Sequence, residues 1–182
     1  MRSLCRISTA ALPCFTTVIA GITIRPLSDS DRSAVGAVLA ADGGYAQRVH
    51  GRPPESDDVT GLFTARPPAT QPEQKHLLGL FLGRELMGVA DLATDWPEPG
   101  VNFLGLLQLR VDAQGQGLAR RFHDHLLSAF PAGREWQLNV VDTNAEVQPF
   151  WEHLGYRVTG QRKSWTSPTG LEHGVVVLAR ES

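Results

Sequence analysis

The stretch LLQLRVDAQGQGLARRFHDHLL, residues 106–127, reads as an apolar strand, a glycine-containing turn and an amphipathic helix. Gly115 and Gly117 lie in the turn, and apolar residues recur at helical spacing from Leu118 to Leu126. A helix start exposes backbone N–H groups without internal partners and carries the positive end of the helix dipole. Glycines let an anion approach such backbone closely. The stretch therefore predicts either a plain connection or a phosphate site at the helix start.

Two common glycine-rich phosphate motifs do not fit this turn. A P-loop requires a Lys-Ser/Thr pair after the glycines, and Gly117 is followed by Leu-Ala instead. A dinucleotide-binding fold requires three glycines in a short βαβ unit near the start of the domain, whereas this turn lies in mid-chain. Two glycines near a helix start are common in proteins, so a second segment is needed to decide the function.

The flanking sequence predicts one mixed α/β (α+β) domain. Alternating residues such as Ile22 and Ile24 indicate a first strand, and Ser28 with Asp31 has the spacing of a helix capping box. Gly83-Arg84 indicates a hairpin. We expect strands near residues 22–26, 76–82, 85–94, 101–111, 135–141, 156–165 and 174–180, helices after Ser28, within 57–63, from 118 and within 146–154, and a loop or broken helix over 43–56.

Composition sets limits on the class of protein. The 182 residues are 42% hydrophobic and 20% charged, with a net charge of −2, which is typical of a globular domain. The sequence has no run of Lys or Arg of the kind that would indicate a nucleic-acid partner. It also has no apolar run long enough for a membrane span. Cys5 and Cys14 fit neither a metal spacing nor a redox pair. We therefore expect no nucleic acid, no membrane and a cytoplasmic location.

Residues 1–20 allow several interpretations. Arg2 and Arg6 precede a mildly apolar stretch, which is the outline of a signal peptide, but Pro13 and two threonines interrupt it. A targeting segment, a tail and a start codon placed too far upstream all remain open. We expect a disordered extension over residues 1–20 and a folded domain over 21–182.

The segment NAEVQPFWEHLGY, residues 144–156, follows the next expected strand. Together with QGQGLA it resembles the GNAT superfamily of acyl-CoA-dependent N-acyltransferases. The family's phosphate turn, Arg/Gln-x-x-Gly-x-Gly/Ala after an apolar strand, is matched by Gln114, Gly117 and Ala119. The family's next helix begins with Asn, carries an aromatic pair and ends in Gly-aromatic, matched by Asn144, Phe150-Trp151 and Gly155-Tyr156. The element order of residues 22–180 also fits the family's fold, a mostly antiparallel sheet with a splayed parallel strand pair and helices on both faces.

The resemblance implies that acetyl-CoA, and no metal, binds in a cleft between the strands at 106–111 and 135–141. Its pyrophosphate would lie on the N–H groups of residues 115–119, and its pantetheine arm would pair with the strand edge like an extra strand. The N–H of Leu109 would stabilise the oxyanion. The cofactor-binding residues implied are Leu109, Arg110, Val111, Gln114, Gly115, Gln116, Gly117, Leu118, Ala119, Arg120, Asn144, Phe150 and Trp151.

Trp151 is a departure from the family. Many members have Tyr at this position, which is thought to protonate the leaving thiolate, and the indole N–H of Trp cannot do this. A thiol has a pKa near 8.5, so that thiolate is a tolerable leaving group at neutral pH. We expect Trp151 to form either a wall of the acyl-CoA cleft or part of the core. Pro149 is a second departure and predicts a late helix start.

A general base and an acceptor site are less well marked. Asp91 and Asp142, each near a strand end, are our base candidates, and the alternative is that they cap backbone N–H groups. Tyr45, Arg48 and Arg52 lie in the region that covers the acceptor in the resembled family. The two arginines suggest an acceptor with a carboxylate or phosphate, unless this is a solvated basic loop.

We therefore expect an N-acetyltransferase that transfers acetyl from acetyl-CoA to a primary amine, on a small molecule or a peptide, by direct attack in a ternary complex. A non-catalytic acyl-CoA sensor is the alternative, and a nucleotide-binding domain of another fold is a weaker one. Exposed strand edges are compatible with a homodimer. His123 and His125 straddle the polar side of their helix and are expected to face solvent.

Overall fold

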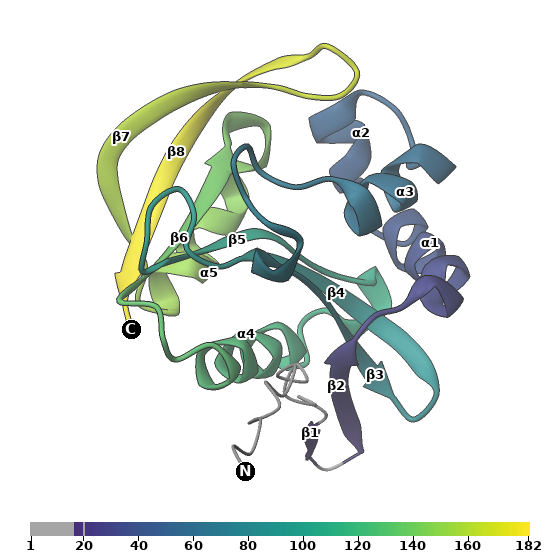
Figure 1. Cartoon of the computed structure of the whole chain (residues 1–182). Coiled ribbons are helices and arrows are strands. Elements are labelled where there is room, and N and C mark those ends of the chain that lie inside the picture. The colour runs from purple at the N-terminus through teal and green to yellow at the C-terminus, as the bar shows by residue number, and fades with distance from the viewer. Residues whose placement is uncertain (1–16, 20) are drawn as a thin grey trace, which may run out of the picture.

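A twisted sheet forms the centre of the molecule, with helices on both faces (Figure 1). The computed structural model describes residues 17–19 and 21–182, and in this part of the chain the sheet has eight strands in the order β1-β2-β3-β4-β5-β6-β8-β7. The strands are β1 Thr17–Ile19, β2 Ile22–Pro26, β3 Lys75–Leu82, β4 Glu85–Ala93, β5 Val101–Leu109, β6 Glu135–Val141, β7 Arg157–Thr166 and β8 Glu172–Glu181. Strands β5 and β6 pair in parallel and all other neighbours pair antiparallel, which confirms the predicted fold class.

Five α-helices cover the two faces of this sheet within the described residues. They are α1 Arg32–Ala40, α2 Tyr45–His50, α3 Ser56–Thr64, α4 Leu118–Ala129 and α5 Gln148–His153, with short 3-10 turns η1 Asp29–Asp31, η2 Pro72–Gln74, η3 Val111–Ala113 and η4 Asp142–Val147. In Figure 1, α1, α2 and α3 lie on one side of the sheet and α4 on the other. No helix among the described residues is long and apolar enough to cross a membrane.

Local sequence signals explain the element boundaries. The side chain of Asp31 accepts the backbone N–H of Ser28 at 2.9 Å, so the predicted capping box forms, although it caps η1, which leads into α1. Helix α2 occupies part of the expected loop at 43–56 and begins after Gly44, whose φ of 90° is left-handed. Helix α5 begins at Gln148 with a proline in its first turn, as Pro149 predicts.

The N-terminal side of the domain extends further than expected. Thr17–Ile19 forms β1 and pairs antiparallel with Ile22–Ile24 of β2, so ordered structure begins before residue 21. The expectation of a disordered extension otherwise falls on residues 1–16 and 20, which lie outside the described residues.

A β-bulge in β5 shapes the centre of the sheet. Asp91 pairs with Leu106 and Leu92 with Leu104, so Gly105 is an extra residue in β5. Strands β5 and β6 pair over Val101–Leu104 and Glu135–Leu138, and their pairing stops there. A bulge bends and twists its strand, and here the two parallel strands separate directly after it.

The larger core cluster lies on the face covered by α4 and α5. Phe122 and Leu126 of α4 are fully buried, together with Trp136 of β6 and Tyr156. A second cluster lies between α1 and the opposite face, around Val35 and other side chains of the sheet. The predicted apolar face of α4 therefore fixes this helix on the sheet.

His123 does not face solvent, contrary to expectation. Its side chain is fully buried and its Nε2 lies 3.0 Å from the hydroxyl of Tyr156. The rings of Trp136, Trp151 and Tyr156 surround it at centroid distances of 5.5 to 6.4 Å. Helical periodicity predicts a polar side for α4, but it does not show that aromatic residues from β6 and α5 cover that side.

Burial gives His123 a consequence for stability. Desolvation is the main cause that lowers the pKa of His123 to about 4, and nearby Arg180 adds to it. The unfolded chain binds the proton near pH 6.5 and the folded protein does not, so stability is lost as pH falls from 6.5 toward 4. We expect the native protein to lose about 2 kcal/mol more stability between pH 7 and pH 4.5 than His123→Phe. Urea unfolding at both pH values measures this, and equal pH dependence of the two proteins would contradict it.

Candidate functional site

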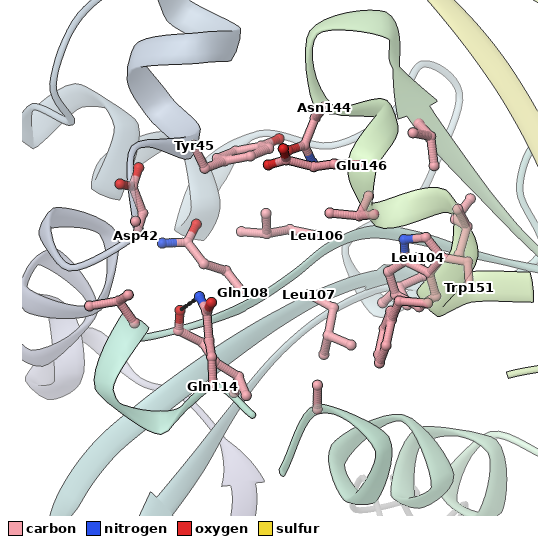
Figure 2. Close-up of a pocket in the computed structure, with 18 of the residues that line it drawn as sticks. Asp42, Tyr45, Leu104, Leu106, Leu107, Gln108, Gln114, Asn144, Glu146 and Trp151 are labelled. Carbon is pink, nitrogen blue, oxygen red and sulfur yellow. Dashed lines mark hydrogen bonds between the residues drawn. The ribbon is translucent and has the colours of Figure 1, made fainter. Parts of the chain in front are cut away.

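The separation of β5 and β6 opens a cleft of about 650 Å³ (Figure 2). Its lining comes from β5 and β6, the glycine turn, the start of α4, the segment η4–α5 and the start of α2 with the loop before it. The expected strand pair and both sequence motifs therefore line a single cavity. Figure 2 shows Leu104 and Trp151 at one end of the view and Gln114 toward the other.

The glycine turn is shaped for close approach by a ligand. Gly115 and Gly117 have left-handed φ values of 72° and 75°, and no atom lies within 4 Å of a Cβ placed on either residue. The side chain of Gln114 donates to the Leu109 carbonyl at 3.3 Å, and that of Gln116 to the Asp112 carbonyl at 2.9 Å. Because α4 begins at Leu118, the N–H groups of its first turn have no partner within the helix and border the cleft.

Most of the expected cofactor-binding residues come together in this cleft. Those that line it are Leu109, Val111, Gln114, Gly115, Gly117, Leu118, Ala119, Arg120, Asn144, Phe150 and Trp151. Arg110 and Gln116 are not among the lining residues. Arg110 pairs with Asp112 at 2.6 Å, and Gln116 stabilises the turn from outside.

Beyond Leu104 the inner edge of β5 has no strand partner among the described residues, and the Leu109 carbonyl on this edge accepts the side chain of Gln114. The N–H of Arg110 donates to the Met87 carbonyl at 2.9 Å, and Leu109 lies opposite Gly88. In an antiparallel ladder the residues that face the partner strand alternate, so the N–H and C=O groups of Leu107 and Leu109 point away from β4, toward the cleft. Leu109, the expected oxyanion donor, lies on this edge, and so does Leu107, which the period of two in a strand would have indicated.

Trp151 lies between the cleft and the core. It lines the cleft, yet its side chain is buried, with ring centroids 5.0 Å from Phe150 and 5.6 Å from Tyr156. Both expectations for Trp151 therefore hold: its indole ring forms part of the cleft wall and also packs in the core.

The two base candidates lie outside the residues that line the cleft. The carboxylate of Asp91 pairs with Lys75 Nζ at 2.7 Å, and burial raises the pKa of Asp91 while Lys75 opposes the shift. Asp142 accepts the N–H groups of Gly174 at 3.0 Å and Thr143 at 2.7 Å, and these bonds, the one to Gly174 first, lower the pKa of Asp142. Asp142 thus caps backbone N–H groups, as the alternative interpretation held, whereas Asp91 forms an ion pair with a lysine side chain instead.

Tyr45 and Arg48 line the cleft, whereas Arg52 does not. Arg52 binds both oxygens of Asp58, at 2.6 and 3.1 Å. Arg48 donates to the Gly43 carbonyl and to Asn144 Oδ1, both at 3.2 Å, and pairs with Glu146 at 3.1 Å. Both guanidinium groups thus have acidic partners within the protein, so the structure does not support the expectation of an anionic acceptor.

Three polar residues that line the cleft were not expected from the sequence: Asp42, Gln108 and Glu146. Asp42 accepts the N–H groups of Gly44 and Ala46, both at 2.6 Å, and so caps the start of α2. Gln108 is buried and donates to the Val38 carbonyl at 3.1 Å. Glu146 projects from η4. The signal for Gln108 was a polar residue in an apolar strand, and Asp42 precedes a Gly-Gly pair, a common turn signal.

Comparison with known proteins identifies the family of the chain. The model of the acetyltransferase (GNAT) family matches residues 45–156, more than half of the chain. The chain belongs to the GNAT acetyltransferase family. Its activity is that of an acetyl-CoA-dependent N-acetyltransferase, and the matched region includes the glycine turn and the segment from Asn144 to Tyr156. Among the described residues, no group of three or more His, Cys, Asp or Glu side chains is placed to hold a metal ion.

Solved structures show the same fold. An acetyltransferase from Thermus thermophilus superposes with a TM-score of 0.70 at 21% identity, covering 88% of this chain and 97% of that one. An acetyltransferase from Salmonella typhimurium that modifies the N-terminal serine of ribosomal protein L7/L12 superposes with a TM-score of 0.72 at 17% identity. The match covers 90% of this chain and 96% of that one. The acetyltransferase yncA from the same species, solved with acetyl-CoA, superposes with a TM-score of 0.63 at 18% identity. The match covers 88% of this chain and 94% of that one. No functionally curated protein matches the sequence significantly.

Proposed function

We propose that this GNAT protein transfers acetyl from acetyl-CoA to a primary amine by direct attack in a ternary complex. The observation that carries the proposal is that one cleft joins the open glycine turn to the unpaired edge of β5. A turn alone would hold any phosphate. The strand edge adds a place for an extended amide-containing arm, which acyl-CoA has and a simple nucleotide lacks.

The residues that would hold the acetyl donor follow from this geometry. The N–H groups of residues 115–119 and the dipole of α4 suit the pyrophosphate, with Arg120 beside them. The amides of the pantetheine arm would pair with the N–H and C=O groups of β5 that face the cleft. Phe150 and Trp151 close the apolar end, and the side chain of Asn144 lies on the rim.

The reaction needs a donor for the oxyanion that forms on the thioester carbonyl. A backbone N–H on the edge of β5 is fixed in place and loses no rotamer freedom when it binds. We assign this role to Leu109, with Leu107 about 7 Å further along the strand as the next group on the same edge. The acceptor, a small amine or a peptide, would enter between α2 and η4.

Two measurements test this function. Calorimetry with CoA and acetyl-CoA tests binding, and release of free CoA thiol across a panel of ethylamine, putrescine, glycinamide, an alanine-initiated peptide and Nα-acetyl-lysine tests turnover. We expect micromolar binding and turnover of at least one amine. The absence of CoA binding would refute the assignment of the cleft, and tight binding without turnover would favour the acyl-CoA sensor.

Substitutions at Trp151 test whether this residue limits the reaction. We expect Trp151→Phe to retain most activity and Trp151→Tyr to raise the rate little, because a thiol of pKa about 8.5 already leaves readily as thiolate near neutral pH. Trp151→Ala should be slower, since it leaves a void beside Phe150 and Tyr156. The measurement is turnover at saturating acetyl-CoA across pH. A gain above about tenfold on Trp151→Tyr would show that protonation of the thiolate is limiting.

A further inference from the structure

The cleft contains few groups that could accept a proton from the attacking amine. Its charged or titratable lining residues are Asp42, Tyr45, Arg48, Arg120 and Glu146, of which Asp42 and Glu146 are carboxylates. Each oxygen of Asp42 already accepts a backbone N–H at 2.6 Å at the start of α2. Both oxygens of Asp42 are therefore engaged in holding the start of α2, so this carboxylate is suited to capping rather than to proton transfer.

Glu146 differs from Asp42 in having an uncommitted oxygen. Its Oε1 lies 3.1 Å from Nη2 of Arg48, whereas its Oε2 has no hydrogen-bond partner within the described part of the chain. The side chain is 68% exposed, so it can exchange a proton with water. Arg48 also donates to the Gly43 carbonyl and to Asn144, and so orients Glu146 from the opposite wall.

Glu146 faces the side from which an acceptor can arrive. All three side chains, Tyr45, Asn144 and Glu146, line the cleft, and in Figure 2 Tyr45 points from the start of α2 toward the side of η4, with its hydroxyl at that end. That hydroxyl makes no hydrogen bond with the described residues, so it remains available to a ligand. On the other face of β5, Leu107 and Leu109 pack with the core beneath α4. The amine therefore reaches the thioester from the side of α2 and η4.

We propose that Glu146 is the general base for the acceptor amine, an inference that rests on the proposed function. The acceptor ammonium gives one proton to Glu146, and the nitrogen lone pair then forms the C–N bond to the thioester carbonyl carbon. The C–S bond breaks with its electron pair moving to sulfur, and the second proton of the nitrogen passes to the thiolate or to water. The products are the acetylated amine and CoA, and Glu146 returns its proton to solvent. Arg48 is a positioning residue in this scheme.

A matched pair of acceptors separates a base from a merely structural residue. Ethylamine is protonated at neutral pH, whereas the fluorines of 2,2,2-trifluoroethylamine keep that amine largely unprotonated. We expect Glu146→Gln to lower kcat/KM about 100-fold for ethylamine and less than about threefold for trifluoroethylamine. Calorimetry should show unchanged CoA affinity. The control is Glu152→Gln on α5, since Glu152 is exposed, bonds to Gln148 at 2.8 Å and lies outside the cleft lining.

The pH dependence gives a second readout, taken on the amine of the panel that turns over fastest. The loss in Glu146→Gln should shrink as pH rises through the pKa of the acceptor, because the free amine no longer needs a base. A loss equal for both ethylamines and constant across pH would overturn the role of Glu146 while leaving the transferase function intact. Failure of the native protein to bind CoA or to acetylate any amine would instead refute the proposed function itself.

Discussion

Gly117→Glu is expected to lower CoA affinity at least 100-fold while leaving the fold intact. No atom lies within 4 Å of a Cβ at Gly117, so the first atom of the new side chain meets open space. It would place a carboxylate where the pyrophosphate should lie, next to the first turn of α4, so both its volume and its charge oppose binding. Calorimetry with CoA measures the change.

The control for this prediction is Gly117→Gln, which has nearly the same volume and no charge. Both variants share the strain of an L-residue at a φ of 75°, about 1–2 kcal/mol, so the difference between them isolates the charge. The neutral variant should retain measurably more affinity than the acidic one. If Gly117→Glu binds CoA like the native protein, the phosphate site lies elsewhere.

Phe122→Ala should cost about 3–5 kcal/mol of unfolding free energy, the largest stability effect expected in α4. Phe122 is fully buried in the main core cluster, and alanine would leave a cavity between α4 and the sheet. In a chain of this size the melting temperature should fall by roughly 10 °C. Thermal and urea unfolding both measure this change.

Arg121→Ala is the matched control for this prediction, because Arg121 is the adjacent residue on α4 and is exposed. It should change stability by less than about 0.5 kcal/mol. A loss below about 1 kcal/mol in Phe122→Ala would mean that α4 is not anchored through this ring. The packing that directs the helix N-terminus at the cleft would then need another explanation.

The fold and the meeting of the two sequence motifs at one cleft could be predicted because local patterns encode them. Glycines in a turn, apolar residues at a period of 3.6 and an asparagine before an aromatic pair are all read within about twenty residues. The parallel pairing of β5 with β6 followed from the resemblance and is confirmed by the register between Val101 and Glu135.

The side of the cleft near α2 and η4 could not be predicted in the same way, because distant segments build it. Arg48 meets Glu146 across almost a hundred residues of sequence, and His173 Nε2 lies 2.9 Å from the carbonyl of Val49. Asp91 and Asp142 were selected for lying near strand ends, but a strand end does not show which partner a carboxylate finds. The burial of His123 was missed for the same reason, since the rings that cover it come from other elements.

The unpaired stretch of β5 also bears on aggregation. A free strand edge invites pairing with another polypeptide, and natural sheets protect such edges with charge or with covering elements. The outer strand β7 carries Arg157, Arg162 and Lys163 along ten exposed residues. The inner edge of β5 carries no charge from Leu106 to Leu109, and it lies inside the cleft between α4 and η4. The inner edge of β5 is thus protected by its position inside the cleft and not by charged side chains.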